Sequence, residues 1–129
     1  MKVQHYKAVQ PIRADEIERA TTGVTIRRLI SEVDGAGSYT LDIFEVEPNG
    51  HSTFHAHAWE HHGYVIRGQG ALVGPSGETP IREGDVLYIP PEEPHQFRNT
   101  GDSPLEMICL LPQVALTAYY MERINADAP

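Results

Sequence analysis

The chain has 129 residues, and its 18 Asp and Glu outnumber its 10 Lys and Arg, which gives a formal net charge of −8 with His neutral. Such an acidic chain, without a cluster of Lys or Arg, argues against nucleic acid and anionic membrane surfaces as partners. No apolar leader opens the sequence, no 18 apolar residues follow one another, and the one cysteine, Cys109, suits a reducing compartment. We therefore expect a soluble, cytoplasmic protein with a single domain over residues 1–129, a length that buries roughly two-thirds of the unfolded surface.

Short β-rich runs follow one another along the chain, separated by turn sequences such as DGAG, GPSG and REGD. The expected strands are 24–30, 38–47, 63–68, 70–74, 85–90, 95–99 and 105–112. Short helices are expected only at 14–20 and 116–124. Strands this short and regularly spaced predict an all-β fold, either a sandwich or a small barrel.

The stretch HAHAWEHH at residues 55–62 holds four of the seven histidines. Alternate residues of a strand project from one face, so His55 and His57 should point together, and His61 has the same parity. A bend at residues 58–60 weakens that argument for His61, whereas His62 should face away. A later strand that begins near His95 can converge on the same point, so the pattern predicts a metal site with one remote ligand.

These histidines belong to two spaced motifs. The first reads Gly50, four residues, His55-x-His57, three residues, His61, six residues and Gly68. The second reads Gly84, five residues, Pro90-x-Glu92, two residues, His95, three residues and Asn99. Together they resemble the two motifs of a small single-domain cupin, over about residues 50–68 and 84–99. The resemblance implies a double-stranded β-helix, or jelly-roll barrel, although Glu92 stands where the family pattern has Gly.

The third ligand position departs from the common cupin pattern, which has a Glu there. HAHAWEHH is similar to a subgroup in which four imidazoles hold the metal, here His55, His57, His61 and His95. Glu60 and His62 are the alternatives to His61, which the six-residue spacing to Gly68 favours. The resemblance implies one divalent transition metal per chain, with manganese the most frequent occupant. Imidazole also binds Fe, Ni, Cu and Zn, so the ligands do not identify the ion.

Four neutral ligands would leave a divalent ion with its full charge and two open coordination positions. The resemblance implies dioxygenase or oxidase chemistry on a small organic molecule as the leading expectation for the function, and the two open positions permit it. The alternatives are a non-redox Lewis-acid enzyme, such as an isomerase, decarboxylase or lyase, and a sensor that binds a small ligand without turnover. A closed, structural zinc site is a further alternative. No carboxylate is evident among the residues that are expected to face inward, although a lyase or isomerase needs a general base.

Several aromatic and sulfur-containing residues are candidates to line an apolar pocket above the metal, although each is individually typical of core. They are Phe44, Trp59, Tyr64, Tyr88, Phe97, Met107 and Cys109. The expected partners are a small-molecule substrate or ligand and, from the resemblance, a second copy in a homodimer.

Overall fold

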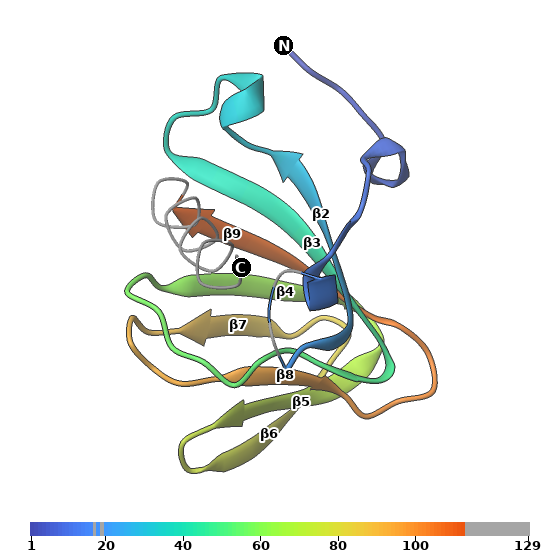
Figure 1. The fold of residues 1–129 in the computed structure, drawn as a ribbon, viewed down its shortest axis with the longest axis vertical. Coiled ribbons are helices and arrows are strands. Elements are labelled where there is room, and N and C mark those ends of the chain that lie inside the picture. Colours follow the sequence, from blue (N-terminus) through green and yellow to red (C-terminus); the bar gives the residue numbers. More distant parts are fainter. Residues whose placement is uncertain (17, 19, 113–129) are drawn as a thin grey trace, which may run out of the picture.

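The computed structural model describes residues 1–16, 18 and 20–112. These residues form short 3₁₀ helices and antiparallel strands (Figure 1), which confirms the predicted all-β class. In chain order the elements are η1 (Tyr6–Ala8), β1 (Ile12–Arg13), η2 (Ala14–Glu16), β2 (Thr22–Ile30), η3 (Glu32–Asp34), β3 (Tyr39–His51), β4 (His61–Arg67), β5 (Gln69–Gly74), β6 (Gly77–Arg82), β7 (Val86–Ile89), β8 (Gln96–Asn99) and β9 (Leu105–Pro112). Each helix of the described residues has three residues, far short of the length that spans a membrane.

The strands form one curled sheet in the order β6-β5-β8-β3-β9-β4-β7, with β2 on the other edge of β3 and β1 beside β2. Strand β3 pairs with β9 as far as Val46 and then with β8 at His51. Because one long strand changes its neighbour in this way, the sheet curls into the half-open barrel that Figure 1 shows. The chain segments around β3, β4, β8 and β9 thereby surround one interior.

The core lies on the concave face of this sheet. Its most buried side chains come from different strands, and Val65, Leu105 and Met107 have no exposed surface. The β4–β5 junction requires glycine. At Gly68, φ is +87°, and a Cβ there would lie 2.4 Å from the Pro104 carbonyl oxygen; at Gly70 a Cβ would lie 2.4 Å from that of Arg98. These glycines permit close contact between backbones.

Several elements differ from the sequence prediction. Strand β4 begins at His61 rather than at residue 63, and β3 continues past residue 47, where its end was expected, to His51. Strand β6 was missed because it is polar and contains Pro80, which is tolerated since β6 is an edge strand. Of the expected helix at 14–20, the described part contains only η2. The expected helix at 116–124 lies outside the described residues.

Candidate metal centre

The backbone joins the histidine-rich stretch to the second motif. His55 and His57 lie in the loop between β3 and β4, not in a strand, so strand parity is not what aligns them. Instead, the His55 amide donates to the His95 carbonyl oxygen at 3.0 Å, and the His95 amide donates back at 2.8 Å. The Glu92 amide donates to the His57 carbonyl oxygen at 2.7 Å. Main-chain hydrogen bonds therefore fix the loop against the segment that carries the remote ligand.

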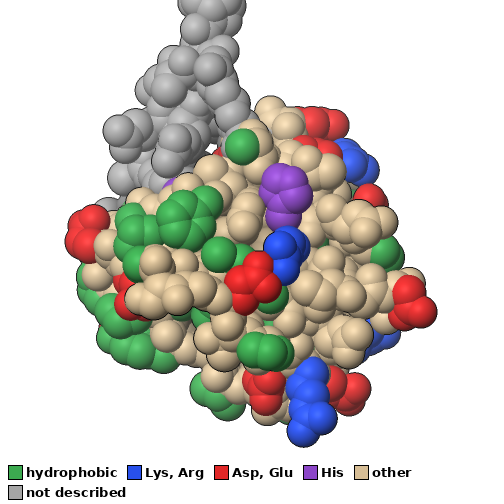
Figure 2. All heavy atoms as spheres, turned by 90° about the horizontal axis from the view of Figure 1, so that it is seen from below, with side chains coloured by type: hydrophobic (Ala, Val, Ile, Leu, Met, Phe, Trp, Pro, Cys, Tyr) green, Lys and Arg blue, Asp and Glu red, His purple; other side chains and the backbone are tan. Residues whose placement is uncertain are grey.

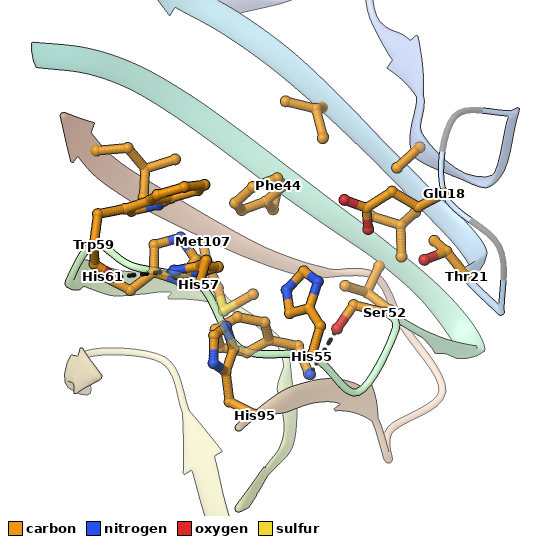
Figure 3. A pocket seen from close by; sticks show the side chains of 16 residues that line it. Glu18, Thr21, Phe44, Ser52, His55, His57, Trp59, His61, His95 and Met107 are labelled. Atoms are coloured by element: carbon orange, nitrogen blue, oxygen red, sulfur yellow. Dashed lines mark hydrogen bonds between the residues drawn. The ribbon is translucent and has the colours of Figure 1, made fainter. Parts of the chain in front are cut away.

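Three imidazoles converge closely enough to hold one ion. One ring nitrogen from each of His55, His57 and His95 lies within 4.8 Å of the other two. His61, at the start of β4, lies next to this group, with its ring centroid 5.4 Å from that of His57 and 5.6 Å from that of His95. Figure 3 shows His57 and His61 near Trp59, and His55 on the side toward Ser52.

Hydrogen bonds set the tautomers of two rings for metal binding. The Nδ1 of His57 lies 2.9 Å from the Trp59 carbonyl oxygen, and the Nδ1 of His95 lies 2.9 Å from that of Glu93. A carbonyl oxygen only accepts, so both Nδ1 atoms carry the proton, and both Nε2 atoms carry the lone pair that a metal ligand needs. The Nδ1 of His61 is buried without a hydrogen-bond partner among the described residues.

The electrostatics keep these rings neutral. Burial lowers the pKa of His57 and of His95 below its ordinary value. Burial, followed by the neighbouring histidines, lowers the pKa of His61 to about 3. Among the described residues, no carboxylate belongs to the cluster. Neutral nitrogen donors of this kind fit a divalent first-row transition ion better than Mg²⁺ or Ca²⁺, which prefer oxygen.

The histidines close one end of a cavity with mainly apolar walls. Four of the predicted pocket residues line it, namely Phe44, Trp59, Phe97 and Met107. The Trp59 indole stacks on the His57 ring, with centroids 4.3 Å apart and planes at 7°. The other lining residues are Ala14, Glu18, Thr21, Val24, Ile26, Val46, Ser52 and Leu111, together with the four histidines.

Three predicted pocket residues do not line this cavity. Tyr64 and Tyr88 are 47% and 58% exposed, because they occupy the outward-facing positions of β4 and β7, so this prediction was wrong. Cys109 is buried in the core and pairs in register with Asp42, but it is not among the residues that line the cavity. Burial raises the pKa of its thiol, and the Asp42 carboxylate adds to this effect.

The two alternative third ligands also point away from the cluster. His62 is exposed, and its Nε2 lies 3.1 Å from Oε1 of Glu60. The hydroxyl of Tyr88 donates to Oε2 of Glu60 at 2.9 Å. The side chains of Glu60 and His62 therefore contact other groups on the outer face. Of the three candidates for the third ligand position, His61 is the one that faces inward.

The cavity has a polar end that the sequence did not indicate. Glu18, Thr21 and Ser52 line the end of the cavity away from Trp59 (Figure 3). In sequence Glu18 is one of several charged residues in a short expected helix, and no motif sets it apart. Its place becomes visible only when the segment before β2 is seen to pack against the loop that carries His55.

A family model described as a cupin domain matches residues 42–111. The chain is a cupin. The match contains the whole candidate metal centre, and a three-histidine cluster able to hold a metal ion is consistent with this family.

Solved structures share the fold. The polyketide cyclase RemF from Streptomyces resistomycificus is 34% identical with a TM-score of 0.79, over 87% of this cupin and 79% of that chain. A predicted oxalate decarboxylase from Thermotoga maritima shares the fold at 23% identity, with a TM-score of 0.76 over 87% of this chain and 99% of the other.

Curated relatives match over shorter stretches. The 1-methylthio-D-xylulose 5-phosphate methylsulfurylase of Rhodospirillum rubrum is 36% identical over 72 residues, which are 55% of this cupin and 46% of the relative. The curated relatives that it matches are covered over only 29% to 46% of their length. The names of these proteins include a cyclase, a decarboxylase and a methylsulfurylase, so membership of the family does not fix one reaction.

Proposed function

We propose that this cupin binds one divalent first-row transition ion through His55, His57, His61 and His95 and acts as a non-redox Lewis-acid enzyme on a small carbonyl compound. The observation that carries the proposal is the position of the histidine cluster at one end of an apolar cavity. Three ring nitrogens lie within 4.8 Å of one another. The buried Nδ1 of His61, which has no hydrogen-bond partner among the described residues, is consistent with a fourth ligand whose imidazole is completed by the ion.

The donor set determines the electrostatics of such a site. Four neutral imidazoles leave a divalent ion with its whole charge, and an octahedral ion would keep two positions for substrate oxygens. When bound, the ion would supply a Lewis acid that stabilises negative charge on those oxygens. Manganese remains the first expectation for the occupant, with Fe, Ni, Cu and Zn as alternatives.

The shape of the cavity favours one chemical class of substrate. Phe44, Phe97 and Met107 form an apolar wall next to the histidines, and Trp59 covers the His57 ring. This arrangement suits a largely apolar molecule with two adjacent oxygens at one end, such as a β-dicarbonyl compound. The 34% identity to a polyketide cyclase supports an enolisable polycarbonyl substrate and supports chemistry without an external oxidant.

Oxidation by a dioxygenase or oxidase mechanism is the second candidate. The two coordination positions and the apolar lining, which favours dioxygen over water, support it. Binding of a small ligand without turnover is the third, and it differs from both in leaving the ligand unchanged.

One experiment separates these candidates. Protein purified without a histidine tag is loaded with Mn²⁺ or Fe²⁺ and incubated with 1-phenylbutane-1,3-dione or catechol, with and without dioxygen. Lewis-acid catalysis predicts conversion or α-hydrogen exchange of the diketone in the absence of oxygen. Dependence on oxygen uptake would favour the second candidate, and binding without any conversion would favour the third. A protein with His57→Ala and His95→Ala is the control.

We also propose that the chain forms a homodimer through the outer face of β4 and β7. Tyr64 pairs with Val86, and Tyr88 follows two residues along β7, so these exposed side chains form one largely apolar strip next to the His62–Glu60 pair. Val86 is 79% exposed. Figure 2 shows that apolar side chains gather toward one side of the lower face, while acidic and basic side chains are interspersed elsewhere on it.

A further inference from the structure

We infer that Glu18 is the general base of this site and accepts the proton that the substrate loses from carbon. The inference rests on the proposed Lewis-acid function and adds the residue that such a reaction requires. Stabilising an enolate oxygen is not sufficient, because a C–H proton must also be transferred to a positioned acceptor.

The lining of the cavity leaves one candidate. The titratable side chains among the described lining residues are the four histidines and Glu18. A bound ion would occupy the histidine lone pairs, and a neutral hydroxyl such as that of Thr21 or Ser52 is not a base at neutral pH. Among the described lining residues, Glu18 is therefore the one that carries a carboxylate.

The hydroxyl groups beside Glu18 already have other partners. The Oγ1 of Thr21 lies 2.8 Å from the Oγ1 of Thr53 and also accepts a hydrogen bond from the Thr53 amide at 3.1 Å. The Oγ of Ser52 accepts one from the Phe97 amide at 2.9 Å. These hydrogen bonds connect the loop after β3 to the residue before β2 and to β8, and they fix the shape of the polar end of the cavity.

The segment that carries Glu18 is anchored in the core. The Glu18 amide donates to the Ala14 carbonyl oxygen at 2.8 Å, and Ala14 is 3% exposed within the core cluster. Figure 3 shows the Glu18 carboxylate turned into the cavity, with the His55 ring between it and His57. A small substrate whose two oxygens bind the ion and whose central C–H bond faces away from it would present that bond to the end of the cavity that Glu18 lines.

The step is a simple proton transfer. A C–H bond between two carbonyl groups breaks, its proton forms an O–H bond with the Glu18 carboxylate, and the electron pair of the C–H bond delocalises onto the two carbonyl oxygens. No oxidant or reductant is consumed. The same carboxylic acid can return the proton to carbon in the reverse direction or after a new bond has formed.

Binding kinetics of acetylacetone to the Mn²⁺-loaded protein test this inference, because the keto form of this β-diketone must lose a C–H proton to bind as its enolate. A base accelerates binding and release equally. Glu18→Gln should therefore slow both rates by about 100-fold, the lower end of the usual effect of a general base, and leave Kd within a fewfold. Glu18→Asp should give an intermediate rate. Glu16→Gln, an equal charge change at an exposed position of the same segment, should bind at the wild-type rate.

Elemental analysis first verifies that each variant retains the ion. Wild-type association should also slow when the probe is deuterated at its central carbon, a readout that needs no variant. Equal rates for Glu18→Gln and wild type, a large change in Kd, or no isotope effect would overturn the role of Glu18 while leaving the proposed function standing. Wild-type protein that holds the ion but binds no acetylacetone would overturn both.

Discussion

Replacement of His61 by Leu should separate the stability of this protein from its ability to bind metal. The His61 Nδ1 is buried without a partner, and its ring lies 6.2 Å from that of Phe44 and 6.0 Å from that of Phe97, between centroids. A buried unsatisfied polar atom costs about 1–3 kcal/mol. Leu removes that cost in an apolar setting, so the metal-free variant should gain about 1–3 kcal/mol. For a chain of this size each kcal/mol raises Tm by about 2–8 °C.

Metal affinity should change in the opposite direction. Four-ligand structural zinc sites bind with about 10–16 kcal/mol, or roughly 3 kcal/mol for each ligand. Loss of one ligand therefore corresponds to about a 100-fold weaker Kd at 1.4 kcal/mol per tenfold. Thermal unfolding with a chelator and calorimetric titration with Mn²⁺ measure the two effects, with exposed His62→Leu as the matched control. A metal-free variant that is less stable, together with unchanged Mn²⁺ affinity, would refute the assignment of His61.

Three further results are expected. Between pH 6.5 and 5 the chelator-treated protein should lose stability on acidification, because the unfolded chain binds a proton that folded His61, with its pKa lowered to about 3, excludes. In urea unfolding, the free energy of unfolding of His61→Leu should depend less steeply on pH over that range. An equal pH dependence in the variant and the wild type would count against His61 as the origin. The φ of Glu92 is +65°, a left-handed conformation that costs a non-glycine residue about 1–2 kcal/mol, whereas glycine costs less there but loses more chain entropy on folding. Glu92→Gly should therefore stabilise the protein by about 0.5–1 kcal/mol in equilibrium denaturation. A loss of stability would argue against backbone strain at this residue. In light scattering after gel filtration the wild type should have twice the 14.4 kDa chain mass, and Tyr88→Lys should reduce it toward the monomer; a wild-type monomer at high concentration would contradict the proposed interface.

The two spaced motifs carried most of what could be predicted. The predicted all-β cupin fold is confirmed, and the spacing that selected His61 over His62 agrees with the inward face of β4. Glu92 stood where the family pattern has Gly, and it adopts a backbone conformation that favours Gly. Such positions are predictable because they depend on local geometry that a short motif encodes.

Other features depend on contacts between distant segments and left no local pattern. His55 and His57 are aligned by hydrogen bonds to the segment around His95, not by the strand parity from which the sequence argument began. Tyr64 shares parity with outward-facing His62 on β4, so its position along the strand, and not its aromatic character, decides that it lies outside the pocket. Glu18 reaches the cavity only through the packing of its segment, so nothing in its own neighbourhood distinguished it.

The most direct test of the central claim is a titration of the metal-free protein with Mn²⁺, followed through the fluorescence of Trp59. It is the one tryptophan of the chain, and it stacks on the ring of His57. The account predicts a change in fluorescence that saturates at one ion per chain, agrees with elemental analysis, and is severely weakened by His57→Ala or His95→Ala. Saturable binding of the same strength in both variants, or no binding by the wild type, would contradict a metal centre at these histidines.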